Sequence, residues 1–134
     1  MTYRSRANCE AVYAAIPGGV PVFGLAGTLH ETVAREMGIP FVAELYGDVR
    51  YNADRTLVID RKKKKWDIEE VKRHVRTQVE GARVVAVDGT EVELPVGQCE
   101  VSLCCHSDSP GAVEIVKAAR EIVDEYNAKN FSKQ

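Results

Sequence analysis

The sequence contains no long hydrophobic run and almost no excess of charge of one sign. No apolar stretch approaches the roughly 18 residues of a membrane-spanning helix, and the first residues lack the apolar stretch of a secretory signal. Eighteen basic residues against twenty acidic ones give a formal net charge of −2, so no overall field attracts the chain to nucleic acid or to a membrane surface. We therefore expect a cytoplasmic protein that binds neither nucleic acid nor membranes.

Cysteine is scarce and is not spaced for a structural metal site. The chain has no C-x-x-C pair, which gives a zinc site little support, and we assign no metal ligand. Without a secretory signal we expect a reducing compartment, where disulfides are rare. Free thiols are therefore favoured over two disulfides for Cys9, Cys99, Cys104 and Cys105.

What the sequence does contain is the composition of a folded protein of modest size. Its 134 residues are 45% hydrophobic and 28% charged, values that exclude a disordered chain. A chain of this length buries enough surface to fold without a disulfide or a metal, and it suits one domain. The sequence therefore predicts a single domain over residues 1–134.

Capping signals and apolar spacing predict four helices, over residues 5–16, 28–38, 67–79 and 109–128. Thr28 and Asp67 are each followed three residues later by a glutamate, which is the capping-box pattern. Ser109 is predicted to cap the last helix, with Pro110 at its first helical position. The core face of that helix is predicted to comprise Ala112, Ile115, Val116, Ala119, Ile122, Val123 and Tyr126.

Short apolar runs between the helices predict strands over residues 20–26, 41–46, 83–87, 91–95 and 98–105. The strand-helix-strand order at the start of the chain indicates a parallel β-α-β unit. The sequence Asp-Gly-Thr at residues 88–90, between two of these runs, is typical of a β-hairpin. The predicted fold class is therefore α/β with a β-hairpin embellishment.

One segment, residues 47–66, has no clear period. A structureless segment of this length inside a compact domain is usually functional or mobile. It includes the run Lys62–Lys65, for which a solvated loop is favoured over a contact with nucleic acid or an acidic partner. The reason is that the whole chain is acidic and only Trp66 supplies an aromatic ring nearby.

The most pointed candidate site is the segment from Cys104 to Pro110, where a strand ends and a helix begins. Open α/β sheets and barrels place their ligand sites at the carboxyl ends of the strands. His106 can act as an acid or a base near neutral pH, and Asp108 could orient it or bind a cation. Alternatively, Asp108 and Ser109 cap the helix while His106 packs in the core. The residues alone leave both interpretations open.

A second cluster follows the predicted strand over residues 41–46. It supplies two carboxylates, Glu44 and Asp48, and a guanidinium, Arg50, which suits bidentate binding of a carboxylate or phosphate. A surface ion-pair network is the alternative, and the spacing alone favours it slightly. The segment Gly24–Thr28 is interpreted as a tight strand-to-helix turn, because it matches no phosphate-binding motif.

Four segments in order resemble the LamB/YcsF lactam-utilisation family, whose bacterial members include the A subunit of ATP-dependent 5-oxoprolinase. The resemblance covers about Val20 to Asn127. The four segments are Val22-Phe-Gly-Leu-Ala-Gly, Glu44-Leu-Tyr-Gly-Asp48 with Arg50 and Tyr51, Ala53-Asp-Arg-Thr-Leu-Val, and Cys104-Cys-His106-Ser-Asp108-Ser-Pro110.

The chain also departs from the family pattern at several places. Val49 stands where the family has arginine, and Arg50 comes one place late. Ser107 replaces a motif glycine, and Lys62–Lys65 replace a stretch that usually is short and contains glycine. Family members are about twice as long, and their amino-terminal half carries histidine-containing motifs that this chain lacks. The resemblance is therefore to the carboxy-terminal half of the family only.

The resemblance implies half of a β/α barrel of the glycoside hydrolase/deacetylase type. Such a half-barrel leaves two strand edges unpaired, so a homo-oligomer or a complementary amino-terminal half is expected as a partner. The implied reaction is hydrolysis of a cyclic amide, 5-oxoproline, to glutamate. It is coupled to ATP hydrolysis by partner subunits of the 5-oxoprolinase B and C type, and the resemblance specifies no metal.

The same resemblance assigns roles to the candidate residues. His106 and Asp108 would be catalytic and would handle protons or orient the lactam. The residues expected to bind the substrate are Glu44, Asp48, Arg50, Ser107 and Ser109. The alternative is a non-catalytic chain of the same family, either a binding or regulatory remnant or a truncated product.

Overall fold

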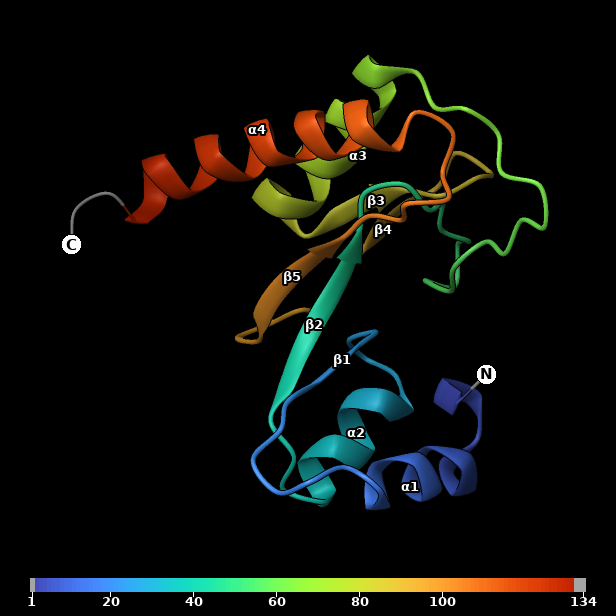
Figure 1. Cartoon of the computed structure of the whole chain (residues 1–134), viewed down its shortest axis with the longest axis vertical. Coiled ribbons are helices and arrows are strands. Elements are labelled where there is room, and N and C mark those ends of the chain that lie inside the picture. The colour runs from blue at the N-terminus through green and yellow to red at the C-terminus, as the bar shows by residue number, and fades with distance from the viewer. Residues whose placement is uncertain (1, 132–134) are drawn as a thin grey trace. The chain divides into compact units, whose positions relative to one another are not determined.

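The computed structural model describes residues 2–131 and is drawn in Figure 1. The chain divides into two compact units. The first unit comprises the residues up to Leu45 together with Pro95–Leu103, and the second comprises Tyr46–Leu94 and the residues from Cys104 on. The prediction that residues 1–134 form one domain stays a prediction.

The first unit is built on a parallel pair of strands joined by a helix. Its elements begin with a short 3-10 helix and continue through α1, β1, α2 and β2, with the bounds Thr2–Arg4, Arg6–Ala14, Val22–Gly24, Leu29–Glu36 and Phe41–Tyr46. Val22 pairs with Phe41 and Gly24 with Ala43 in parallel register. The pairing confirms the predicted β-α-β unit.

Local signals explain where the two helices of this unit begin. The hydroxyl of Ser5 accepts the backbone N–H of Asn8 at the start of α1, and the hydroxyl of Thr28 accepts that of His30 at the start of α2. Each bond satisfies an amide that the first turn of a helix leaves without a partner. The two helices and β1 then bury a core cluster of Cys9, Tyr13, Val22, Val33 and Ala34.

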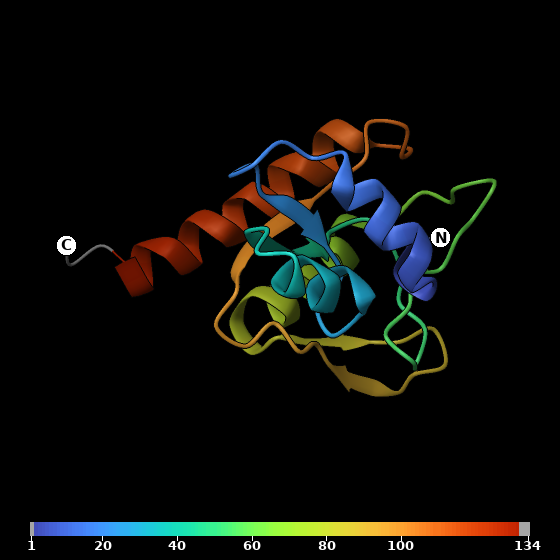
Figure 2. The same ribbon diagram turned by 90° about the horizontal axis from the view of Figure 1, so that it is seen from below.

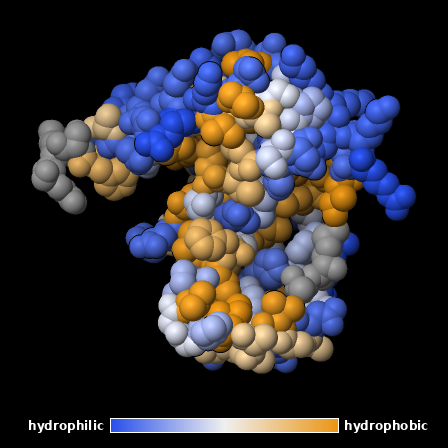
Figure 3. All heavy atoms as spheres, in the orientation of Figure 1, coloured by the Kyte–Doolittle hydropathy of each residue, from blue (hydrophilic) through white to orange (hydrophobic). Residues whose placement is uncertain are grey.

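β5 (Glu100–Cys104) completes a three-stranded sheet in the order β1-β2-β5. Side chains alternate across a strand, so Val22 faces the helices and Phe23 lies on the opposite face. The side chain of Phe23 is 53% exposed, and Val101 on β5 is 48% exposed. Figure 3 shows hydrophobic atoms over β2 and β5. The sheet therefore keeps apolar side chains in contact with solvent.

The second unit combines a helix pair with a β-hairpin. Its regular elements are α3 (Ile68–Gly81), β3 (Arg83–Val85), β4 (Glu91–Glu93) and α4 (Ala112–Phe131). The helices α3 and α4 pack against each other, and β3 pairs antiparallel with β4, side by side in Figure 2. Gly89, with a φ of +88°, makes the tight turn between the strands, as the sequence predicted.

Asp67 begins α3 as predicted, because its carboxylate accepts the backbone N–H groups of Glu69 and Glu70. The predicted apolar stripe is buried at Val71 and Val75. Residues 47–66 form no helix or longer strand, and a single bridge pairs Tyr51 with Leu57. The unperiodic segment is thus irregular but locally ordered by hydrogen bonds.

The prediction that Ser109 caps α4 with Pro110 at its first position is wrong. The helix begins at Ala112, because the hydroxyl of Ser109 donates to Asp48 instead of accepting a helix amide. Gly111 adds a φ of +77°, which does not belong to a right-handed helix. The predicted core face is also wrong at Val116, which is 50% exposed.

In the described part of the chain, no helix is both long and apolar enough to cross a membrane. The 20 residues of α4 would be long enough, but charged side chains occur along its whole length. The four cysteines are unpaired in the structure.

Candidate active site

Asp48 is a buried carboxylate that three donors hold in place. It lies two residues beyond β2, and its side chain has no exposure to solvent. Its Oδ2 accepts the hydroxyl of Ser109 and the backbone N–H of His106, the latter at 2.9 Å. Its Oδ1 lies 2.8 Å from Nδ1 of His106. We call Asp48, His106 and Ser109 the Asp48 cluster.

These bonds keep Asp48 ionised although it is buried. Burial by itself would raise the pKa of the carboxyl. The hydrogen bonds from Ser109 and from both N–H groups of His106 outweigh burial, so the pKa of Asp48 lies below its ordinary value. The cluster therefore contains a fixed negative charge at neutral pH.

The charge of Asp48 determines how His106 holds its proton. An ionised carboxylate only accepts hydrogen bonds, so Nδ1 of His106 carries a hydrogen and Nε2 holds the lone pair of the neutral ring. The His106 side chain is 37% exposed and stacks on Tyr46, with ring centroids 6.3 Å apart and planes 11° from parallel. An imidazole held in one tautomer by a buried carboxylate is the arrangement of a general base.

Asp108 is placed differently from the partner of His106 that the sequence suggested. Its side chain is 74% exposed, and Oδ1 accepts a hydrogen bond from Nζ of Lys63 at 2.5 Å. That hydrogen bond lowers the pKa of Asp108. The carboxylate that orients His106 is therefore Asp48.

Arg50 is engaged in contacts of its own. Its guanidinium donates to Oε1 of Glu70 at 2.7 Å and lies over the ring of Trp66, 4.1 Å from the ring centroid. The side chain of Trp66 is buried and packs against His74, with centroids 5.0 Å apart. Burial lowers the pKa of His74. The ion-pair network that the sequence offered as an alternative is thus present at Arg50.

The structure places the remaining predicted site residues as follows. Glu44 belongs to the first unit, where it is half-buried on β2. Ser107 is exposed beside His106. Ser109 is buried, with its hydroxyl turned to Asp48.

Gln78 on α3 supports the site and was missed by the sequence analysis. It is buried, and its Nε2 donates to the backbone oxygen of Tyr46 at 3.0 Å. Its Oε1 accepts the hydroxyl of Tyr51 at 3.1 Å. A signal existed, because Gln78 is a polar residue on the apolar helix face of Val71 and Val75.

Gly47 allows the chain to approach the Asp48 cluster closely. Its backbone N–H donates to the oxygen of Cys104 at 2.9 Å. A Cβ atom at this position would lie 2.9 Å from Sγ of Cys105, closer than real side chains permit. Burial, together with the charge of Asp48, raises the pKa of Cys105, so its thiol stays protonated and is a poor nucleophile.

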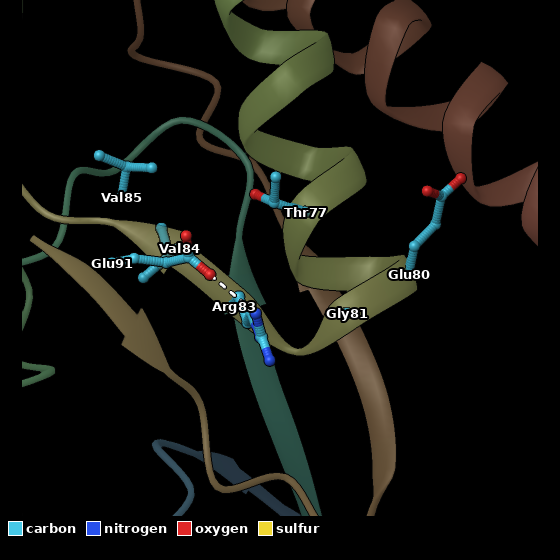
Figure 4. A pocket seen from close by; sticks show the side chains of 7 residues that line it. All are labelled: Thr77, Glu80, Gly81, Arg83, Val84, Val85 and Glu91. Atoms are coloured by element: carbon cyan, nitrogen blue, oxygen red, sulfur yellow. Dashed lines mark hydrogen bonds and ion pairs between the residues drawn. The ribbon is translucent and has the colours of Figure 1, made fainter.

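A separate shallow hollow lies between the end of α3 and the hairpin, drawn in Figure 4. Arg83 crosses it and donates to Glu91 at 2.9 Å. Its lining residues are Thr77, Glu80, Gly81, Arg83, Val84, Val85 and Glu91. None of the predicted site residues takes part in it.

The Asp48 cluster can move protons but offers no metal-binding set. Within residues 2–131 no three His, Cys, Asp or Glu side chains gather closely enough to hold a metal ion. The imidazole of His106 is the group that can take and return a proton near neutral pH. The geometry therefore suits acid–base chemistry on a small polar molecule.

Comparison with known proteins agrees with the resemblance. The sequence profile of the LamB/YcsF family matches residues 2–133. The chain belongs to the LamB/YcsF family. Its membership covers nearly the whole chain, including every residue of the Asp48 cluster.

Three relatives show how similar this LamB/YcsF chain is to known sequences and structures. It is 52% identical over 129 residues to the lactam utilization protein lamB of Emericella nidulans, covering 96% of this chain and 51% of the relative. It is 38% identical over 120 residues to the 5-oxoprolinase A subunit of Mycolicibacterium gilvum, covering 88% and 46%. The crystal structure of a lactam utilization protein from Thermus thermophilus matches with a TM-score of 0.74 and 29% identity, over 92% of this chain and 49% of that one.

The chain spans about half the length of the curated relatives it matches. The comparisons confirm the predicted family and the mixed α/β fold with parallel strands and a hairpin. Activity, substrate and partners belong to the whole-length relatives.

Proposed function

We propose that this chain is the carboxy-terminal half of a cyclic-amide hydrolase related to the A subunit of 5-oxoprolinase, folded as half of a β/α barrel. Family membership and the similarity to proteins that carry this 5-oxoprolinase name support the proposal. The observation that carries it is the hydrogen bond by which the buried carboxylate of Asp48 holds the ring of His106.

The proposed chemistry is acid–base catalysis by His106. When water attacks the carbonyl carbon of a cyclic amide, Nε2 of His106 takes a proton from the water. The protonated ring then gives that proton to the amide nitrogen as the C–N bond breaks, which leaves a carboxylic acid and an amine on one opened chain. Asp48 keeps the ring oriented and stabilises its positive charge in between.

The other predicted residues keep proposed roles in binding. Ser107 and Asp108 are exposed next to His106 in the chain, where they are available to contact the lactam. Arg50 would have to leave Glu70 to bind a substrate carboxylate. Glu44 stays a proposed substrate-binding residue on the strength of the family resemblance.

ATP is proposed to act through partner subunits of the 5-oxoprolinase B and C type. The turn before α2 does not fit a phosphate, because the N–H of Gly27 donates to Oε2 of Glu31 at 2.9 Å. A carboxylate that already occupies the start of a helix repels a second anion there. We therefore assign no step on this chain to ATP.

A non-catalytic role in the same family is the second candidate. The observation that favours it is the length of the chain, which spans about half of its relatives. A binding or regulatory remnant would keep the Asp48 cluster for stability alone. The two candidates differ in whether His106 is needed for turnover.

Turnover of 5-oxoproline distinguishes the two candidates. The chain is combined with the separately produced other half of the Emericella nidulans relative, with ATP and the partner subunits supplied. We expect His106→Ala to abolish glutamate formation at a nearly unchanged melting temperature. Arg120→Ala, an exposed change on α4, should leave turnover unchanged. Turnover retained by His106→Ala would contradict the proposal, and no turnover with the unaltered chain would favour the non-catalytic role.

A further inference from the structure

Lys63 is the member of the lysine run that does not behave as a solvated loop residue. Its side chain is 27% exposed, whereas Lys62, Lys64 and Lys65 are exposed. The segment that carries the run lies at the right of Figure 1 and is mostly hydrophilic in Figure 3. Lys63 therefore has contacts that its neighbours lack.

Those contacts lead into the Asp48 cluster. Nζ of Lys63 lies 2.5 Å from Oδ1 of Asp108 and 3.4 Å from Oγ of Ser109. Ser109 in turn donates its hydroxyl to Oδ2 of Asp48, and Oδ1 of Asp48 accepts Nδ1 of His106. A continuous chain of hydrogen bonds thus joins a loop lysine to the imidazole.

The proton inventory of this chain has one solution. An ammonium group only donates, a carboxylate only accepts, and a serine hydroxyl carries a single hydrogen. Because Lys63 donates to Ser109, the serine hydrogen is directed to Asp48. Hydrogen bonds in such a chain strengthen one another, and the result is an Asp48 carboxylate whose Oδ1 is left to hold the Nδ1–H of His106.

We propose that Lys63 is a positioning residue that fixes the tautomer of His106 through Ser109 and Asp48, and that Asp108 anchors Lys63 in place. The ion pair with Asp108 is the closest contact of the ammonium group, so it sets where Nζ lies. This inference rests on the proposed function only for the use that the fixed His106 ring serves.

The tautomer of His106 is measurable on this chain without any assay of activity. Ring 15N chemical shifts distinguish Nδ1–H from Nε2–H, and the spectrum of His106→Ala assigns the signals among the three histidines. The measurement is made well above the ordinary histidine pKa of about 6.5, where the ring is neutral. In the unaltered chain we expect the Nδ1–H form to dominate.

Lys63→Met should lower the ratio of Nδ1–H to Nε2–H about fivefold, which corresponds to the loss of one hydrogen bond of ordinary net strength. Lys63→Arg keeps a donor at this position and should preserve the ratio. Lys64→Met removes the same charge from the adjacent exposed position and should not change it. An unchanged ratio in Lys63→Met would overturn the inference.

Asp108→Asn separates position from charge. Losing its anchor releases Lys63, so the ratio should fall as it does in Lys63→Met. If Lys63 and Asp108 acted only by their opposite charges, the two variants would move the ratio in opposite directions, and that result would overturn the inference. A ratio that stays unchanged in Asp108→Asn would refute the anchoring role. A negative result here leaves the turnover test of His106→Ala unaffected.

Discussion

Asp48 receives hydrogen bonds from a hydroxyl, a backbone amide and an imidazole N–H. An asparagine in its place keeps the shape but turns one acceptor into a donor, which then faces a donor of Ser109 or His106. We expect Asp48→Asn to lower the free energy of unfolding at neutral pH by about 2–3 kcal/mol, because charge-assisted bonds are lost in a buried place. The chemically identical change Asp108→Asn, at an exposed side chain, should leave the melting temperature nearly unchanged.

The pH dependence of stability provides a second measurement on the same variants. The pKa of Asp48 is lower in the folded state than its ordinary value of about 3.9, so its stabilisation is fully present above that value and is lost as the pH falls through the folded pKa. Asp48→Asn should therefore flatten the acid side of the stability curve. Glu31 and Glu36, whose pKa values are also lowered, would account for the slope that remains. An acid limb as steep as in the unaltered chain would contradict this assignment.

Gly47 tests how tightly the chain packs around the site. Gly47→Ala places a Cβ 2.9 Å from Sγ of Cys105, and overpacking of this kind costs about 1–3 kcal/mol. Adding Cys105→Ala removes the sulfur and should recover part of the loss. Gly81→Ala is the matched control, because no atom lies within 4 Å of the new Cβ and alanine suits the helix. Chemical denaturation measures all of these variants, and equal effects at Gly47 and Gly81 would contradict the close packing.

At the scale of secondary-structure elements, α4 shows which of its faces is buried. The buried residues are Ile115, Ala118, Ala119 and Ile122. Ile115→Ala should lower the free energy of unfolding by about 2–5 kcal/mol, since it empties a buried site against α3. Val116→Ala, at a half-exposed neighbour, should change it by less than about 0.5 kcal/mol. Similar losses in both variants would mean that the buried face is assigned wrongly.

The elements also show what could be predicted from the sequence. Caps at Thr28 and Asp67 and the hairpin turn at Gly89 were predictable, because each depends on a few adjacent residues. The cap at Ser109 was not, since the same hydroxyl is bound by Asp48, 61 positions earlier. Local signals cannot reveal a distant competitor for a hydrogen bond.

The candidate site follows the same rule. His106 was found because histidine after a strand is a distinctive signal, and Asp48 was found as a carboxylate after another strand. Their pairing was missed, because sequence proximity favoured Asp108 as the partner of His106. Lys63 was assigned to a solvated loop because nothing local distinguishes it from its three lysine neighbours.

At the scale of the whole molecule, the sheet of the first unit keeps exposed apolar side chains, including Phe23 and Val101. Its outer strands β1 and β5 are edges of the three-stranded sheet, and strand edges promote association. We expect the chain to self-associate at micromolar concentration in analytical ultracentrifugation. Phe23→Asp should weaken association, whereas Phe131→Asp, an exposed change on α4, should not. A single species at 14.8 kDa for the unaltered chain would contradict the prediction.

Asp48 and His106 lie 58 positions apart in the chain, and this separation links the chemistry to the folding reaction. Helices and the hairpin can form from neighbouring residues, but the two members of the pair meet only when a long loop closes, at an entropic cost that rises with the logarithm of its length. Contacts of high sequence separation slow folding. Until that closure the imidazole exchanges its hydrogen between both nitrogens as a free histidine does. We therefore expect the His106 ring to acquire its fixed tautomer together with the long-range contacts, so that an acid–base group becomes competent only in a chain that has completed its topology.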